Sequence, residues 1–170
     1  MYAFMNGANK MKIGLYPGSF DPITHGHVDI AKRALKIFDK LVILVSVNPE
    51  KQTIFTKDER IDMIKHVLKP YEDRIEVTFS DKLTVHAAKA LHASHIIRGL
   101  RAVTDFEYEF QMTHANRELD KGIDSIFFMT DNKYSFLSST AVKEIAQLNG
   151  DLTAFVPPYV KDKLQNKYHK

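Results

Sequence analysis

Short apolar runs alternate with segments of helical period along this chain. The runs cover residues 13–16, 41–47, 75–79, 95–97 and 125–129. Between them, apolar residues recur every three or four positions, which places them on one face of a helix. Because a helix is the usual connection between parallel strands, this alternation predicts an α/β fold with a parallel sheet.

The second apolar run shows how deeply the sheet is buried. Residues 41–45 read Leu-Val-Ile-Leu-Val, with no polar residue in alternation. Such a strand is typical of a parallel sheet that helices cover on both faces. We therefore expect a doubly wound, Rossmann-like sheet of five parallel strands, with helices on both faces and a C-terminal helical segment.

The helical segments carry start and stop signals. Thr56 and Glu59 have capping-box spacing and start a predicted helix that runs to residue 68. Ser138 or Ser139 is expected to cap a helix that reaches residue 148 and stops at Gly150. Further helices are expected at residues 84–91, at residues 105–119, and after the first strand, with Val28, Ala31, Leu35 and Phe38 facing inward.

Length and composition narrow the class of protein. A chain of 170 residues fits one domain, which we expect to span residues 11–170. Residues 1–10 have neither the apolar core of a signal peptide nor the length of a membrane span, so we expect a poorly ordered extension. No membrane association is predicted.

Charge and cysteine content exclude several functions. The 24 Lys and Arg residues nearly balance 21 Asp and Glu residues, and this small excess gives no reason to expect nucleic-acid binding. The chain has no cysteine, which removes disulfides, thiolate nucleophiles and cysteine-based metal sites. A cytoplasmic location agrees with this composition.

The segment between the first strand and the first helix carries the main candidate chemistry. It reads Tyr16-Pro17-Gly18-Ser19-Phe20-Asp21-Pro22-Ile23-Thr24-His25-Gly26-His27, with Pro17-Gly18 and Asp21-Pro22 expected to form turns. A helix start after a strand directs free N–H groups to one point, where an anion can bind. The alternative is an ordinary turn whose hydroxyls only cap the helix. The residue pattern matches neither a P-loop nor a dinucleotide fingerprint.

Three further segments follow strands and therefore meet at the same edge of a parallel sheet. Arg98 and Arg101 flank a glycine and could bind phosphate, although they could also be surface arginines facing Asp105, Glu107 or Glu109. Ser138, Ser139 and Thr140 precede a helix, where one hydroxyl would suffice as a cap. Lys51 could bring an ammonium over the site or lie in solvent.

Together these segments resemble the bacterial phosphopantetheine adenylyltransferases, a family of the nucleotidylyltransferase superfamily. The resemblance covers residues 12–164, and Thr24 and His27 are the two ends of the superfamily pattern Thr-x-Gly-His. That motif alone leaves cytidylyl and nicotinate-mononucleotide transferases open. The segments that narrow the choice are Ile97-Arg98-Gly99-Leu100-Arg101, residues 105–109 and residues 136–144.

The resemblance implies a reaction and a set of site residues. ATP would transfer its adenylyl group to 4′-phosphopantetheine by in-line displacement without a covalent intermediate, giving dephospho-coenzyme A and pyrophosphate. His27 and Ser19 would lie at the reacting phosphates. Lys51 would bridge the attacking phosphate, Arg98 would bind phosphopantetheine, and Thr84 would line its arm. The ATP site would be completed by Phe20, Gly99, Leu100, Arg101, Glu109, Tyr134, Ser135, Phe136, Leu137, Ser138, Ser139 and Thr140.

The family pattern also implies partners and leaves two rival readings. Mg²⁺ would accompany ATP, held mainly by phosphates and water rather than by protein ligands. A homo-oligomer, a hexamer in this family, is expected, with dephospho-coenzyme A and coenzyme A as product or feedback ligands. The rivals are a nucleotidyl transferase for another phosphate acceptor and a nucleotide sensor without catalysis. Ser19 and Thr84 occupy positions that vary in the family, so both bear on substrate fit.

Overall fold

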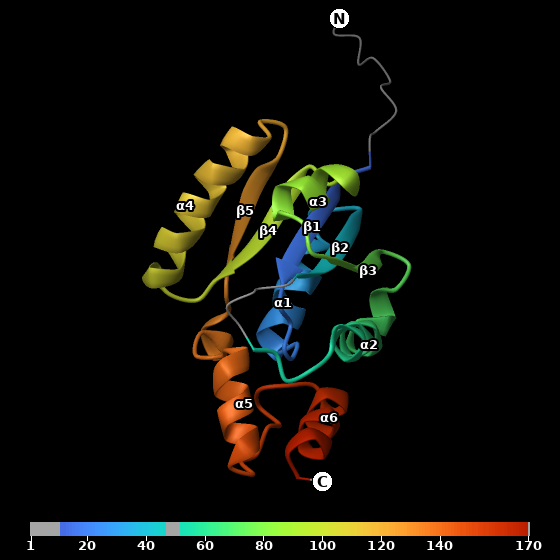
Figure 1. Ribbon diagram of the computed structural model, residues 1–170, viewed down its shortest axis with the longest axis vertical. Coiled ribbons are helices and arrows are strands. Elements are labelled where there is room, and N and C mark those ends of the chain that lie inside the picture. Colours follow the sequence, from blue (N-terminus) through green and yellow to red (C-terminus); the bar gives the residue numbers. More distant parts are fainter. Residues whose placement is uncertain (1–10, 47–51, 170) are drawn as a thin grey trace, which may run out of the picture.

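The computed structural model describes residues 11–46 and 52–169 (Figure 1). The predicted N-terminal extension and Lys51 lie outside the described residues.

The described chain contains one parallel sheet of five strands in the order β3-β2-β1-β4-β5 (Figure 1). Every adjacent pair of strands in it is parallel. The strands are β1 (Ile13–Gly18), β2 (Lys40–Ser46), β3 (Ile75–Ser80), β4 (His95–Leu100) and β5 (Asp124–Met129). The sequence-based prediction of the sheet is therefore confirmed.

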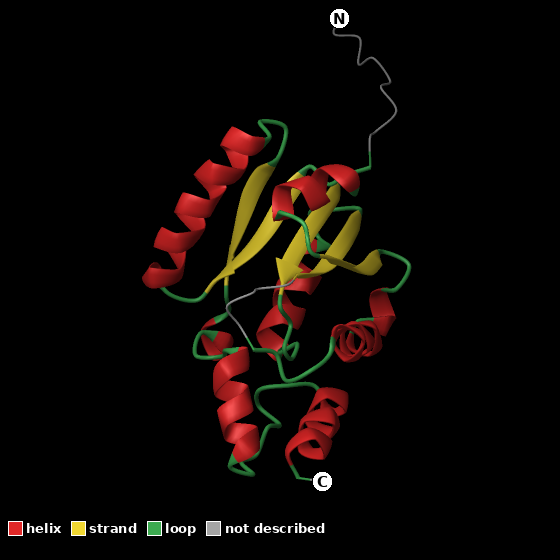
Figure 2. Ribbon diagram, in the orientation of Figure 1, coloured by secondary structure: helices red, strands yellow, loops and turns green. Residues whose placement is uncertain are grey.

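Helices cover both faces of the sheet (Figure 2). The described helices are α1 (His25–Ala34), α2 (Lys57–Val67), α3 (Thr84–Ala90), α4 (Val103–Leu119), α5 (Ser139–Gln147) and α6 (Pro158–Tyr168). Ile30 of α1 and Met63 of α2 share one core with Ile43, whereas Val85 of α3 packs with Val42 in a second core. The fold is thus a doubly wound α/β sheet, and α5 and α6 extend it beyond the carboxyl ends of the strands (Figure 1).

β1 is longer than its apolar run indicates, so the prediction of a turn at Pro17-Gly18 is wrong. Pro17 pairs with Leu44 and Gly18 with Val45 of β2. The carbonyl of Pro17 points the other way and accepts a hydrogen bond from Arg98. The nitrogen of Pro17, which has no N–H, therefore also faces β4. Pairing between β1 and β4 has already ended at Leu15, so Pro17 costs the sheet no hydrogen bond.

β4 also continues past its apolar run. Pairing with β5 extends to Leu100↔Met129, so Arg98 lies within the strand and Arg101 directly follows it. At Gly99, α1 lies close against the strand. A Cβ on Gly99 would come within 2.2 Å of the Cδ1 atom of Ile30.

Several helix ends differ from their predicted positions. α1 ends at Ala34, so Leu35 and Phe38 are buried as predicted but lie beyond the helix. α4 starts at Val103, two residues earlier than expected. α5 ends at Gln147, one residue before the predicted end, and Asn149 after it has a φ of 61°.

Candidate active site

The sheet opens at one point along its carboxyl edge. Its order reverses between β1 and β4, which is where doubly wound folds bind ligands. These two strands pair only at Gly14↔His95 and Leu15↔Ile96, although both continue beyond that point. Their carboxyl ends therefore separate into a crevice that has Ser19 on one side and Arg98 and Arg101 on the other.

The loop after β1 ends in a capping box that includes His27. Thr24 is the N-cap of α1, and its hydroxyl accepts the backbone N–H of His27 at 3.4 Å. In return, Nδ1 of His27 accepts the backbone N–H of Thr24 at 3.0 Å. The simple capping role considered for this loop is therefore filled by Thr24, while His27 takes the place that Glu or Gln usually has in the motif.

This contact determines how His27 can act. Because Nδ1 accepts a hydrogen bond, the proton of the neutral ring is on Nε2. Burial, helped by the positive charge of Arg101, lowers the pKa of His27 to about 4. At neutral pH the ring is therefore uncharged and donates a hydrogen bond through Nε2. It does not take up or release a proton in this pH range.

Phe20, predicted for the ATP site, has a buried side chain. Its side chain is 1% exposed and packs edge-on against Tyr16 and His27, with ring centroids 5.4 and 5.0 Å apart. Its ring is therefore part of the core beneath His27, and only its backbone could face a ligand. The backbone φ of Phe20 is 46°, in the left-handed region that few non-glycine residues adopt.

Arg98 lies in the crevice and is held by Glu109 of α4. Its Nε donates to Oε2 of Glu109 at 2.7 Å, and Nη2 donates to Oε1. Its Nη1 donates to the carbonyl of Pro17 at 3.2 Å, across the gap between β4 and β1. The two predicted site residues Arg98 and Glu109 thus contact each other directly.

Arg101, which directly follows β4, is likewise held by a carboxylate of α4 and a backbone carbonyl. Its Nε and Nη2 donate to Asp105 at 3.1 and 3.2 Å, and Nη1 donates to the carbonyl of Leu137 at 3.1 Å. The side chain of Leu137 is buried, so this predicted site residue contributes its carbonyl to the contact. Arg101 therefore joins β4 to the segment before α5.

The hydroxyl segment before α5 divides into different roles. Ser138 is the N-cap and accepts the backbone N–H of Ala141 at 3.0 Å. The hydroxyl of Ser139 donates to the carbonyl of Pro22 at 2.9 Å, which ties α5 to the loop after β1. Thr140 is exposed, and it does not cap the helix because Ser138 does so. Of the remaining predicted residues here, Tyr134 is half-buried, while Ser135 and Phe136 are exposed.

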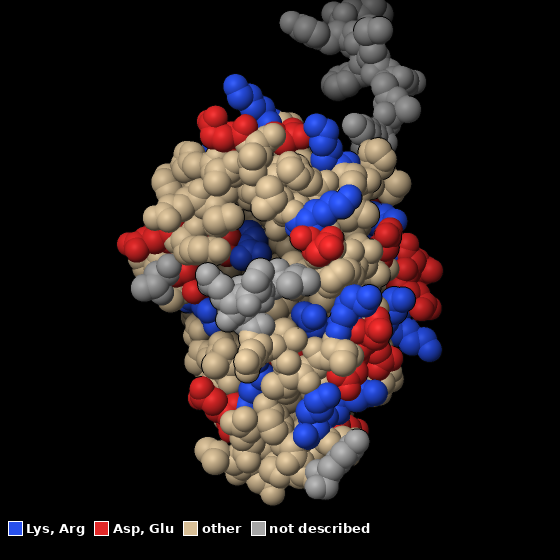
Figure 3. All heavy atoms as spheres, in the orientation of Figure 1, with Lys and Arg blue, Asp and Glu red and all other residues tan. Residues whose placement is uncertain are grey.

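A cavity of about 210 Å³ lies between the loop after β1 and the start of α5. It is lined by Ser19, Asp21, Gln52, Thr53, Ser139, Thr140 and Lys143. Its lining combines four hydroxyls and one ammonium, which suits an anionic or polar ligand. The space-filling view also shows a hollow near the middle of the molecule that contains Lys or Arg atoms (Figure 3).

Sequence reasoning missed three residues that hold this region together. Asp21, expected only as a turn residue, is buried and accepts the backbone N–H groups of Ile54 and Phe55 at 3.1 and 3.0 Å. It also pairs with Lys143 of α5 at 3.0 Å. Arg60 of α2 donates to the carbonyl of Ser19 at 2.8 Å. Asp21 and Lys143 lie within the sequence motifs and Arg60 does not, but the polarity of these residues gave no sign of their contacts.

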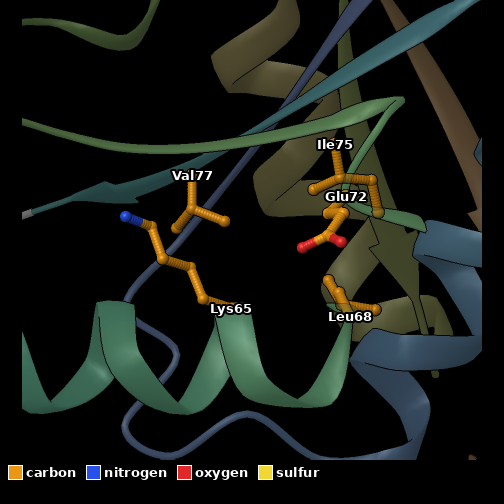
Figure 4. A pocket seen from close by; sticks show the side chains of 5 residues that line it. All are labelled: Lys65, Leu68, Glu72, Ile75 and Val77. Carbon is orange, nitrogen blue, oxygen red and sulfur yellow. The ribbon is translucent and has the colours of Figure 1, made fainter. Parts of the chain in front are cut away.

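One further candidate residue and a second hollow complete the description of this region. Thr84 begins α3 beyond the end of β3, and no hydrogen bond within the described residues joins it to Arg98 or His27. A second hollow lies between α2 and the edge strand β3 (Figure 4). Its lining residues, none of them predicted for the site, are Lys65, Leu68, Glu72, Ile75 and Val77.

The described residues contain neither a cluster of metal ligands nor a helix able to span a membrane. No group of three or more His, Asp or Glu side chains there could hold a metal ion. Asp21, the buried carboxylate in the cavity, already has an ammonium and two N–H groups as partners. No helix among residues 11–46 and 52–169 has both the length and the apolar character to cross a membrane.

The fold and the crevice define a class of enzyme. The sequence profile of the cytidylyltransferase-like family matches residues 15–145. A putative nicotinate-nucleotide adenylyltransferase from Vibrio parahaemolyticus shares the fold, with a TM-score of 0.71 at 17% identity over 94% of this chain and 96% of that one. A nicotinic acid mononucleotide adenylyltransferase from Plasmodium falciparum has a TM-score of 0.67 at 14% identity over 92% of this chain and 95% of that one. The chain is a nucleotidyltransferase of the cytidylyltransferase-like superfamily.

Relatives with higher sequence identity identify the family. The phosphopantetheine adenylyltransferase of Caldanaerobacter subterraneus subsp. tengcongensis is 49% identical over 160 residues, 94% of this chain and 99% of that protein. The protein of the same name from Geotalea daltonii is 50% identical over 94% of this chain and 99% of its own length. The chain belongs to the phosphopantetheine adenylyltransferase family, as its motifs indicated.

Proposed function

We propose that this protein transfers the adenylyl group of ATP to 4′-phosphopantetheine, forming dephospho-coenzyme A and pyrophosphate. This is the penultimate step of coenzyme A synthesis. The observation that carries the proposal is the near-complete match to the phosphopantetheine adenylyltransferases, at about half of all positions. The β1/β4 switch point supports it, because Arg98 of β4 reaches the carbonyl of Pro17 across the gap there. The cavity beside the loop after β1 adds Ser19 from that loop and Ser139 and Lys143 from α5.

In the proposed reaction, a phosphate oxygen of the acceptor attacks the α-phosphorus of ATP as pyrophosphate leaves. The acceptor phosphate is itself the nucleophile, so the protein needs to orient two anions and stabilise developing charge. His27 suits the second task. Its neutral ring with the proton on Nε2 would donate a hydrogen bond to the α-phosphate and strengthen that bond as charge accumulates.

Positive groups around the crevice would counter the charges of the two substrates. Arg98 would bind the phosphate of phosphopantetheine, and Arg101 would face ATP. Ser19 and the helix start at Ser138–Thr140 would offer hydroxyl and backbone donors to the nucleotide phosphates. Lys51, assigned to the attacking phosphate by the family pattern, belongs to this proposal but lies outside the described residues.

We include Mg²⁺ in the proposal as a partner of ATP. Mg²⁺ retains much of its hydration, so the ATP phosphates and water would provide most of its ligands. This agrees with a cavity whose single carboxylate is already paired. The ion would supply charge neutralisation at the phosphates when bound.

We also propose that the protein is a homo-oligomer, a hexamer by the family pattern. α4 supports this, because it exposes large apolar side chains that a monomer would leave in water. They include Val103, Phe106, Tyr108, Phe110, Met112 and Leu119, between 39% and 79% exposed. Sedimentation velocity would test the assembly, and a monomer at micromolar concentration would contradict it.

The proposal further includes a cytoplasmic location and binding of dephospho-coenzyme A and coenzyme A. Both ligands contain the phosphopantetheine and nucleotide parts that the two substrates contribute, so the same crevice would accept them. Competition of each with ATP in a steady-state assay would test this.

The direct test of the function is pyrophosphate release from ATP with different acceptors. We expect rapid release with 4′-phosphopantetheine and little with nicotinate mononucleotide or glycerol 3-phosphate. Faster release with either of the other acceptors would assign the chain a different substrate. ATP binding without transfer in either direction would make the protein a nucleotide sensor.

A further inference from the structure

The two arginines of the crevice use their donors in the same way. A guanidinium has five N–H groups. In Arg98, three of them have acceptors among the described residues, namely both carboxylate oxygens of Glu109 and the carbonyl of Pro17. One N–H remains on each terminal nitrogen, Nη1 and Nη2.

Arg101 repeats this pattern. Asp105 takes N–H groups of Nε and Nη2, and the carbonyl of Leu137 takes one of Nη1. Within residues 11–46 and 52–169, one N–H on each terminal nitrogen again has no acceptor. In both cases a carboxylate holds the edge of the guanidinium nearest the chain, and donors remain at its tip.

The two carboxylates come from one face of one helix. Asp105 and Glu109 are four residues apart in α4, so they lie one turn from each other. Their side chains are 25% and 11% exposed. Burial alone would raise the pKa of Asp105, but hydrogen bonds and charge from Arg101 lower it, so the carboxyl is ionised at neutral pH. Glu107, two residues from each, projects from the opposite side of the helix and is exposed.

The geometry points to Asp105 and Glu109 as positioning residues that act through Arg101 and Arg98, and this inference rests on the proposed function. Arginine has a long side chain that loses much conformational freedom when it binds a ligand. A carboxylate that fixes one edge removes that freedom in advance and presents the tip to phosphate. Glu109, which the family pattern assigns to the nucleotide site, already has both oxygens on Arg98. It would therefore influence phosphate binding without touching ATP.

The two pairs predict different kinetic effects. Glu109→Gln keeps the size of the side chain but loses one acceptor and the charge, and should raise the KM for phosphopantetheine by about 3- to 10-fold, the loss expected for one freed side chain. The KM for ATP should change less than about twofold. Asp105→Asn should instead raise the KM for ATP and leave the KM for phosphopantetheine nearly unchanged, because Arg101 is the arginine proposed to face ATP. Glu107→Gln, which removes the same charge from the opposite side of α4, should change neither KM.

A double-mutant cycle separates positioning from direct contact. If Glu109 acts through Arg98, Glu109→Gln should have no further effect on either KM once Arg98→Ala is present. A rise in the KM for ATP of the same size in both backgrounds would mean that Glu109 binds ATP itself, and would overturn the inference. A fall in kcat and in unfolding temperature without a selective KM change would overturn it too, because that result indicates a purely structural role.

Different results would contradict the proposed function and the positioning roles of Asp105 and Glu109. If the wild-type protein transfers no adenylyl group to any acceptor, the proposed function is wrong. If the wild type is active but the Glu109 and Asp105 variants keep both KM values within twofold, only the positioning inference is wrong. Calorimetric titration of ATP into the Asp105→Asn variant gives a readout that needs no turnover, and unchanged affinity there would overturn the role of Asp105.

Discussion

The substitution Asp21→Asn tests the contact that joins the most separate parts of the crevice. Asp21 is 3% exposed and lies in the loop after β1. Its carboxylate accepts N–H groups from Ile54 and Phe55, which follow β2, and pairs with Lys143 of α5. One side chain therefore links three segments that are distant in sequence.

The magnitude follows from those three contacts. An asparagine oxygen can still accept one N–H, but its NH₂ group would face another donor. At least one buried N–H would then lose its acceptor, at a cost of about 1–3 kcal/mol. Lys143, whose side chain is 21% exposed, would lose its counter-charge, for which the cost of about 3–5 kcal/mol for breaking a buried pair is an upper limit. Because these effects overlap, we expect the free energy of unfolding to fall by about 3–5 kcal/mol, or roughly 6–20 °C in Tm.

Urea denaturation at one fixed protein concentration would measure the loss, since association alters apparent stability. Asp58→Asn is a matched control, because the side chain of Asp58 is 88% exposed and the expected change is about 0.5 kcal/mol or less. Lys143→Met should cost less in the Asp21→Asn background than in the wild type. A loss below about 1 kcal/mol for Asp21→Asn, or full additivity with Lys143→Met, would refute the reasoning.

Three further predictions concern His27 and Gly99. His27→Ala should lower kcat by about 10²- to 10³-fold with little change in ATP affinity, and a change confined to affinity would make His27 a ground-state ligand. The pKa of His27 is lowered from 6.5 to about 4, so the unfolded chain binds its proton first. Stability from this source should be complete above pH 6.5 and decline as pH falls toward 4, whereas His27→Gln, which can keep the capping box, should lack this decline in urea titrations. Gly99→Ala should cost about 1–3 kcal/mol, because its Cβ would lie 2.2 Å from Cδ1 of Ile30. Ile30→Val removes that atom and should restore stability in the double variant, and failure to do so in thermal melts would place the strain elsewhere.

The sequence itself determined the layers of this protein and its family. The continuous apolar run of β2 predicted a strand buried on both faces, and the structure confirms it. The capping box at Thr56 and Glu59 predicted the start of α2 correctly. These signals are local, because hydrophobic period and capping depend on residues close together in the chain. The motif at Thr24, Gly26 and His27 likewise indicated the superfamily, while the roles of individual site residues stay predictions.

The tertiary structure decided which groups of the crevice contact one another. The sequence left open which of Asp105, Glu107 and Glu109 the arginines face, and the structure pairs Arg98 with Glu109 and Arg101 with Asp105. No pattern showed that Asp21 joins three segments, because these come together only when the sheet forms. Even the end of β1 depended on its neighbours: pairing with β2 continues through Pro17 because its backbone faces the gap beside β4. Local preference sets where a strand or helix can occur, but the partner across the fold sets where it ends and which polar group it satisfies.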